Sequence, residues 1–252
     1  MKRSALALLG LLALPAAAAA QDRPLLANEP PPERLPQHRF ALTPWIGIRV
    51  PFDAGNVVVI SESGDQSRFE SQRGGGGMAG LNAELRLRGP WSLVVGGAYS
   101  AAEQDEITVF HTDESTEIFD TDGPAMWFAK AGVSVRLPDP IPDNRRFHPS
   151  AFITVAPTMV WLDWNGDDEV LDRTSSHFAL NLAADAVTRI GRSERWALSL
   201  GFEDFMTFWN TDDLRVRDTA VGEVIVGEPV VIDYDYSSSN VFVLRFGVSY
   251  RH

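Results

Sequence analysis

His148 and Ser150 are the two residues of this chain whose spacing best suits nucleophilic catalysis. A histidine base beside a serine hydroxyl can activate that hydroxyl, and only Pro149 separates the two residues. The pair lies at the short-turn end of the fifth expected strand, however, and no set of Ser, His and Asp shares an obvious spacing. His111 and His177 stand alone near loops, where we expect them to be solvated. The sequence therefore predicts no catalytic residues.

Oxygen ligands are concentrated in a second segment, which predicts weak binding of a divalent cation. An EF-hand calcium loop needs glycine at its sixth position and an acid at its twelfth, whereas a loop starting at Asp163 has Gly166 fourth and no acid twelfth. Flexible oxygen ligands without a defined cage still suit Ca²⁺ better than a transition metal. A polar turn without a ligand is the alternative, and no other cofactor is expected. The expected ligands are Asp163, Asn165, Asp167 and Asp168.

The elements that must position such residues are β-strands, and the last thirteen residues show the pattern most clearly. From Phe242 to Tyr250 the even-numbered positions are apolar or aromatic, and the odd-numbered positions from Arg245 onward are polar or small. Alternation with period two is typical of a strand whose faces meet different environments. An apolar face opposite a face that carries arginine fits lipid outside and a polar lumen inside. The apolar positions of this C-terminal strand signal are Phe242, Leu244, Phe246, Val248 and Tyr250.

Seven earlier segments repeat this alternation, and each has roughly the ten residues of a tilted membrane-spanning strand. The connections between strands alternate between short and long. An up-and-down barrel with short periplasmic turns and long outer loops gives that order. The short connections are near residues 88–91, 138–147 and 190–195, and the long ones are 53–75, 102–124, 163–176 and 210–237.

Two local features of these segments lead to further expectations. In the seventh of the eight segments, which begins at Trp196, the alternation of apolar and polar residues breaks at Asp204, where we expect a bulge. In the fourth long loop, valine-rich stretches on both sides of Gly227 and Glu228 predict a hairpin.

Residues 40–252 thus resemble the small eight-stranded outer-membrane β-barrels of the OmpA, OmpX and OmpW type. The closing aromatic of the last strand, Tyr250, is followed here by Arg251 and His252, whereas in that family it is usually the last residue. The resemblance implies an all-β, eight-stranded antiparallel up-and-down transmembrane barrel in the outer membrane of a Gram-negative bacterium. It also implies contact with outer-membrane lipid and lipopolysaccharide, and recognition of the C-terminal strand by the barrel-assembly machinery.

The first 39 residues are not expected to belong to the barrel. Lys2 and Arg3 precede a short apolar run that ends in small residues, which predicts a cleaved signal peptide over 1–20 and export through the inner membrane. An uncleaved transmembrane anchor is the alternative. Residues 21–39 contain five prolines and predict an extended periplasmic linker.

Charged residues on the polar faces of the strands predict a network inside the barrel. An eight-stranded barrel is just wide enough for side chains to fill it. Charges buried there must pair or stay hydrated, because burying an isolated charge is costly. We therefore expect a polar, plugged lumen, with a narrow ion path as the alternative. The network is expected to contain Arg49, Glu84, Arg86, Lys130, Arg136, Asp185, Arg189, Glu203 and Arg245.

Aromatic residues near the strand ends predict a girdle at each membrane interface, with ordinary core aromatics as the alternative. Phe52 and Phe205 are expected to face lipid near the long loops. The principal girdle residues are Trp91, Trp127, Trp161, Trp196 and Tyr250.

The charge of the chain is concentrated in the long connections. The formal net charge is −12, and the four long connections carry 24 acidic residues against 5 basic ones. Such a surface argues against nucleic-acid binding. The sequence predicts a non-enzymatic barrel with acidic extracellular loops that serves envelope structure or surface contact. The alternatives are a barrel enzyme acting on lipid A or peptides, and a narrow channel for small solutes.

Overall fold

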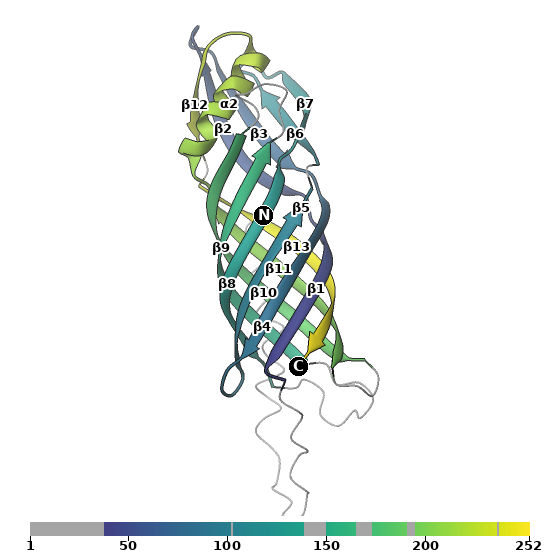
Figure 1. Cartoon of the computed structure of the whole chain (residues 1–252). Coiled ribbons are helices and arrows are strands. Elements are labelled where there is room, and N and C mark those ends of the chain that lie inside the picture. The colour runs from purple at the N-terminus through teal and green to yellow at the C-terminus, as the bar shows by residue number, and fades with distance from the viewer. Residues whose placement is uncertain (1–37, 102, 139–149, 165–172, 191–194, 236) are drawn as a thin grey trace, which may run out of the picture.

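The computed structural model describes residues 38–101, 103–138, 150–164, 173–190, 195–235 and 237–252. These residues form a closed barrel and a second, five-stranded sheet that extends from one end of it (Figure 1). The expected signal peptide and nearly all of the expected linker lie outside the described residues, as does His148. Those assignments remain predictions.

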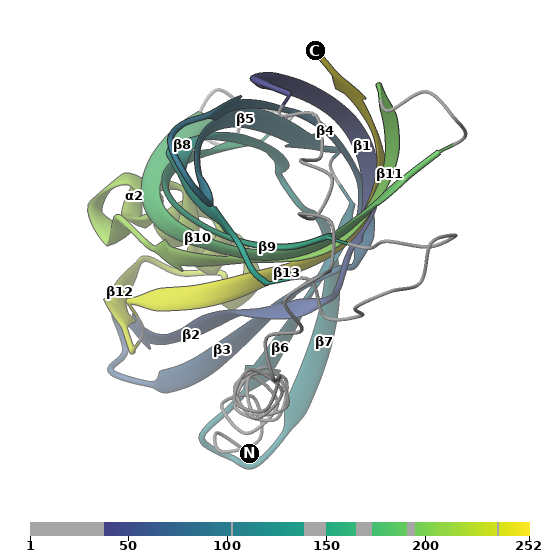
Figure 2. The ribbon, with the colours of Figure 1, turned by 90° about the horizontal axis from the view of Figure 1, so that it is seen from below.

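The barrel is antiparallel throughout, and each strand pairs with the barrel strands that come before and after it in the chain. Seen along its axis in Figure 2, the sheet closes on itself where the last strand meets the first. The predicted eight-stranded up-and-down barrel is therefore confirmed. Its strands are β1 (Phe40–Arg49), β4 (Gly76–Arg86), β5 (Trp91–Ser100), β8 (Ala125–Arg136), β9 (Ser150–Trp164), β10 (Arg173–Arg189), β11 (Trp196–Phe208) and β13 (Ser238–Arg251).

Period-two alternation decides which side chains leave the barrel and which enter it. In β13, Leu244 and Phe246 are exposed on the outside, while Val243 and Arg245 are buried inside. The same outward band includes Ile46 on β1 and is as apolar as lipid requires. We call the end with the short connections the turn end, and the opposite end, which carries the second sheet, the loop end.

The second sheet is built from the long connections, which we expected from the sequence to be acidic loops. Its strand order is β12-β2-β3-β6-β7, and all its pairings are antiparallel. Val59, Phe69, Val109 and Ile232 form its small apolar core. Three connections that are far apart in the chain thus fold together, which we call the lobe. Its strands are β2 (Phe52–Ser61), β3 (Gln66–Arg73), β6 (Gln104–Phe110), β7 (Thr116–Asp122) and β12 (Val230–Tyr234).

Helix α2 (Thr211–Val226) replaces the hairpin expected in the fourth long connection, so that prediction was wrong. The helix has Asp212 and Asp213 in its first turn and ends where Gly227 takes a left-handed conformation at φ 81°. Acidic residues in a first turn and glycine after the last turn are both favourable helix ends. In the part of the chain that the structure describes, no helix is long and apolar enough to cross a membrane.

Two positions near the loop end differ from the expected faces. Strand β11 pairs with both neighbours without any register shift, so the expected bulge at Asp204 is absent. Asp204 points outward and accepts hydrogen bonds of 2.8 and 2.9 Å from the Asn240 amide, while Phe205 turns into the barrel. Phe52 is also buried, because β1 ends at Arg49 and the chain enters the lobe there. Neither aromatic therefore faces lipid.

Candidate functional site

Four of the nine charged residues predicted inside the barrel meet at one level of it. Lys130 Nζ lies 2.5 Å from Glu203 Oε1, and Arg245 Nε lies 3.0 Å from the same oxygen. Arg245 also pairs with Asp185, with 2.6 Å between Nη2 and Oδ2. We call these two cations and two anions the quartet. Because they come from β8, β10, β11 and β13, the quartet ties one side of the barrel together.

Neighbouring residues complete and accommodate the quartet. Lys130 Nζ lies 3.4 Å from the Asn181 Oδ1 atom. When the Asn82 amide is turned so that its oxygen and nitrogen exchange places, its oxygen accepts a hydrogen bond from Arg245 Nη1 at 2.7 Å. Gly201 leaves room for the pair between Asp185 and Arg245, because a Cβ atom there would collide with Asp185 Oδ1. These contacts satisfy part of the buried charge cluster, while Glu203 Oε2 and Asn181 Nδ2 have no hydrogen-bond partner among the described residues.

Toward the loop end, the interior becomes apolar, which the sequence reasoning missed. Phe128 and Phe205 pack with ring centroids 4.6 Å apart, and Lys130 lies 5.8 Å from the centroid of the Phe205 ring. Val241 and Val243 are fully buried beside them. The alternation along the strands could have predicted their inward position, since these residues fall on the same strand faces as the predicted lumen charges. Other members of this core are Trp45, Met78, Met126, Val160, Leu162 and Trp209.

Arg49 lies inside the barrel but is separate from the quartet. Its Nη1 atom contacts the Met126 sulfur at 2.8 Å, and Nη2 donates to the Gly74 carbonyl at 3.1 Å. Only 2% of Arg49 is exposed. This arginine therefore sits at the junction between the apolar core and the lobe.

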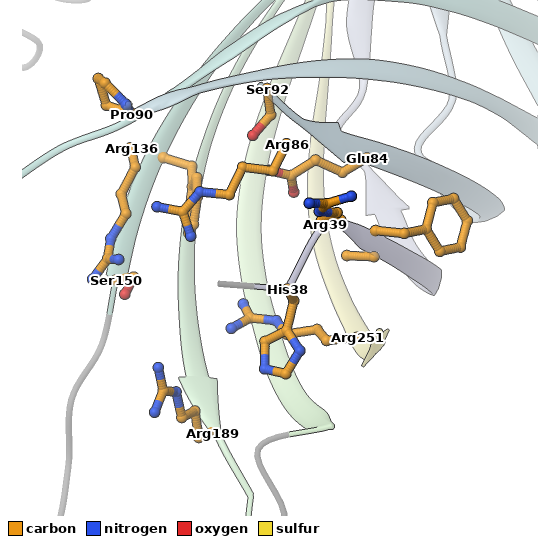
Figure 3. Close-up of a pocket in the computed structure, with 13 residues that line it drawn as sticks. His38, Arg39, Glu84, Arg86, Pro90, Ser92, Arg136, Ser150, Arg189 and Arg251 are labelled. Atoms are coloured by element: carbon orange, nitrogen blue, oxygen red, sulfur yellow. The ribbon is translucent and has the colours of Figure 1, made fainter. Parts of the chain in front are cut away.

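The remaining four predicted lumen residues, Glu84, Arg86, Arg136 and Arg189, line a pocket at the turn end of the barrel (Figure 3). Two further arginines that the sequence reasoning did not include, Arg39 and Arg251, also line it. Arg251 continues the inward parity of Arg245, so its position was available from the alternation.

A serine and a histidine do meet near the loop end, but they are not the pair that the sequence singled out. Ser175 and His177 are buried, with 2.8 Å between the Ser175 hydroxyl and His177 Nε2. The Asn210 backbone N–H donates to His177 Nδ1 at 3.0 Å, so Nδ1 is unprotonated and Nε2 carries the proton. His177 then donates to Ser175 and cannot act as its base. The expectation that His177 is solvated was wrong.

The lobe contains its own buried ion pairs. Arg73 pairs with Asp105 next to the turn at Gly74, whose N–H also donates to Asp105 at 3.2 Å. On α2, Asp218 accepts a 2.9 Å hydrogen bond from the Tyr234 hydroxyl. Burial raises the pKa of the Asp218 carboxyl, while Arg217 and that hydroxyl act in the opposite direction. The contact between Asp218 and Tyr234 fastens α2 to β12.

The other predicted site residues are placed as follows. Of the expected cation ligands, only Asp163 lies in the described part of the chain, where it accepts from the Thr174 hydroxyl at 3.2 Å. Asn165, Asp167 and Asp168 lie outside it, and cation binding there remains a prediction. Among the girdle residues, Trp91, Trp127 and Trp196 are about half exposed, and Trp161 and Tyr250 are half-buried. Trp196 packs edge-on against Tyr250, with 5.1 Å between ring centroids.

Neither a known family model nor a curated protein sequence matches the chain. Solved structures with a similar fold include Neisserial surface protein A, at 10% identity and a TM-score of 0.41 over 84% of this chain and 97% of that one. The outer membrane protein OprG from Pseudomonas aeruginosa is 13% identical, with a TM-score of 0.41 over 84% and 96% of the two chains. Ail, the attachment invasion locus protein of Yersinia pestis, is 10% identical, with a TM-score of 0.32 over 84% and 98%.

The class of protein follows from this chain's own geometry. A closed eight-stranded antiparallel barrel with an apolar outer band and charged residues inside is an outer-membrane β-barrel. The similar structures share that fold and do not assign an activity to the chain.

Proposed function

We propose that the protein is a non-enzymatic barrel of the bacterial outer membrane, reached by export through the inner membrane, that is closed to solutes and presents its lobe outside the cell. The observation that carries the proposal is the stacking of the quartet beneath the apolar core. Every cation of the quartet contacts an anion, and the layer above it is made of packed aromatic and aliphatic side chains. Two such layers leave no hydrated path for an ion.

Surface contact is the role that the lobe supports. The lobe is a folded sheet with its own core and a helix, so it can present a fixed surface to a partner. Strand β7 is one edge of this sheet, and five of its seven residues are exposed, including Glu117 and Ile118. Lipopolysaccharide phosphates bridged by divalent cations are suitable neighbours for so acidic a surface. The barrel-assembly machinery would recognise the C-terminal strand.

The enzymatic alternative finds less support in the described residues. The quartet charges are engaged with one another, and the tautomer of His177 prevents it from activating Ser175. A barrel enzyme would need a base with a free lone pair directed at its nucleophile.

Conductance in planar bilayers tests whether the barrel is closed. The purified protein is expected to insert without producing current steps, because the quartet and the apolar core fill the lumen. The double variant Phe128→Ala/Phe205→Ala, which removes two rings from the core, is the matched comparison and should raise the frequency of brief openings. A stable, large conductance of the unmodified protein would overturn the closed-barrel proposal.

A further inference from the structure

The turn end of the barrel holds a pocket whose lining is strongly basic. Its volume is about 60 Å³, and one carboxylate, that of Glu84, shares the lining with the arginines. Each arginine stands at or next to the end of a barrel strand, so the strand ends bring them into one ring. Figure 3 shows several guanidinium groups pointing toward the same opening. The five arginines are Arg39, Arg86, Arg136, Arg189 and Arg251.

Three of these arginines are not paired in the way that the quartet is paired. Arg251 lies within electrostatic range of Glu84 but also of Arg86, Arg136 and Arg189. Among the residues that the structure describes, Arg39, Arg86 and Arg251 have no carboxylate within ion-pair distance. Repulsion between cations held this close disfavours the empty pocket and favours a bound anion.

The pocket also extends inward rather than ending at a flat surface. A second cavity of about 50 Å³ continues toward the quartet and shares Ala41, Glu84, Phe152 and Arg251 with the first. Hydroxyl groups of Thr43, Ser134, Thr154, Ser199 and Ser249 line this deeper part. The two cavities form a polar well that opens at the turn end and reaches the level of the quartet.

We propose that this well binds the phosphate group of a ligand that enters from the turn end, which faces the periplasm in an outer-membrane barrel. Guanidinium forks donate paired hydrogen bonds that match the oxygens of a phosphate, and several forks around one opening can engage one tetrahedral group. The small volume suits a single phosphate group, with the rest of its molecule outside the mouth. The phosphate source is either a soluble phosphate compound or the head group of a phospholipid in the inner leaflet.

Titration of the folded full-length protein with inorganic phosphate tests the soluble source. Calorimetry in a non-ionic maltoside detergent at low salt should show saturable binding. Arg86→Gln and Arg251→Gln should each weaken that binding about tenfold, the expected effect of removing one charge-assisted contact. Arg88→Gln is the matched control, since it makes the same charge change at an exposed position outside the pocket. Arg39→Gln, at an exposed position, adds a variant that requires no repacking of the lumen.

Extraction from vesicles tests the lipid source. The protein is reconstituted in phosphatidylcholine vesicles that contain a minor fraction of phosphatidylglycerol, extracted, and examined by native mass spectrometry. The unmodified protein should retain phosphatidylglycerol, and Arg86→Gln should lose it. Saturable phosphate binding supports the site with a soluble phosphate as its ligand, and selective lipid retention supports it with a phospholipid head group. In either case the signal must be lost in the pocket variants and kept in Arg88→Gln. Neither signal, or an equal loss in Arg88→Gln, overturns it. The closed-barrel proposal is unaffected by this result, since it depends on conductance.

Discussion

At the scale of single residues, the interior of the barrel depends on pairing charges rather than on excluding them. Glu203 is fully buried and contacts both Lys130 and Arg245. Removing one partner of such a group leaves the others charged, buried and uncompensated, which costs far more than the net value of the pairing itself. Glu203 is therefore the residue of the quartet whose loss should matter most.

Replacing Glu203 tests this directly. Glu203→Gln keeps the side-chain volume and should lower the free energy of unfolding by about 3–5 kcal/mol. The double variant Glu203→Gln/Lys130→Met should recover part of that loss, because it also removes one unpaired cation. Unfolding by urea in lipid vesicles, followed by tryptophan fluorescence, gives both values. Glu223→Gln, at an exposed position of α2, is the control and should change stability by less than about 0.5 kcal/mol. Equal stability of Glu203→Gln and the control would refute the role of the quartet.

At the scale of elements, alternation made the barrel predictable because each strand faces two fixed environments along its whole length. The parity of β13 placed Arg245 inside and Leu244 outside without any knowledge of its partners. The same parity could not show which inward residues form pairs, because the quartet joins strands that are distant in sequence. The apolar core was missed for a different reason, because a membrane barrel was expected to be polar throughout its lumen.

The lobe could not be predicted in the same way, because its strands are defined by pairing rather than by pattern. Strand β12 pairs with β2, and β3 pairs with β6, so each needs a partner from another connection. The end of α2 was mistaken for one arm of a hairpin because Val224, Ile225 and Val226 favour strands. The acidic first turn and the glycine after its last residue were the better guides, since they act on helix ends directly.

The packing of α2 should depend on pH through Asp218. Its pKa in the folded lobe is raised by burial above the ordinary value of 3.8, so the folded state holds the proton more tightly than the unfolded state. The stability that this carboxyl contributes is then fully present below its ordinary pKa and is lost as pH rises through the folded pKa. The protection factors of the α2 amides, which correct for the intrinsic pH dependence of hydrogen exchange, should accordingly rise on acidification.

The variant Asp218→Asn removes the titrating group and keeps an acceptor for the Tyr234 hydroxyl. It should flatten the pH dependence of the α2 protection factors and raise these protection factors at neutral pH. Asp212→Asn, at an exposed position of the same helix, is the matched control. An unchanged pH profile in Asp218→Asn would show that another group governs the packing of the helix.

At the scale of the whole molecule, the lobe gathers the acidic connections at one end while the arginine pocket lies at the other. This separation predicts the result of proteolysis on intact cells. The turn between β6 and β7 contains Asp113 and Glu114, which are exposed, and Glu114 has a φ of 67°. A protease that cuts after glutamate should cleave there from outside, and Glu114→Gln should remove that product.

The opposite end gives the converse measurement of orientation. Arg145 and Arg146 belong to the short connection 138–147, so trypsin should cut after them only once the outer membrane has been permeabilised. Tryptic cleavage at these arginines in intact cells would reverse the proposed topology and place the lobe in the periplasm.

The seam between β1 and β13 has a consequence for how the molecule comes into being. Arg39 and Phe40 donate their backbone N–H groups to the carbonyl of His252, at 2.9 and 3.0 Å, so the first described residues are joined to the very last. Contacts between residues so far apart in the chain carry the greatest loop-closure cost and form slowly. The seam needs both β1 and β13, which lie at opposite ends of the described chain. The cylinder can therefore close only once β13 is present, and we expect the chain to cross the periplasm with the edge of β1 still unpaired.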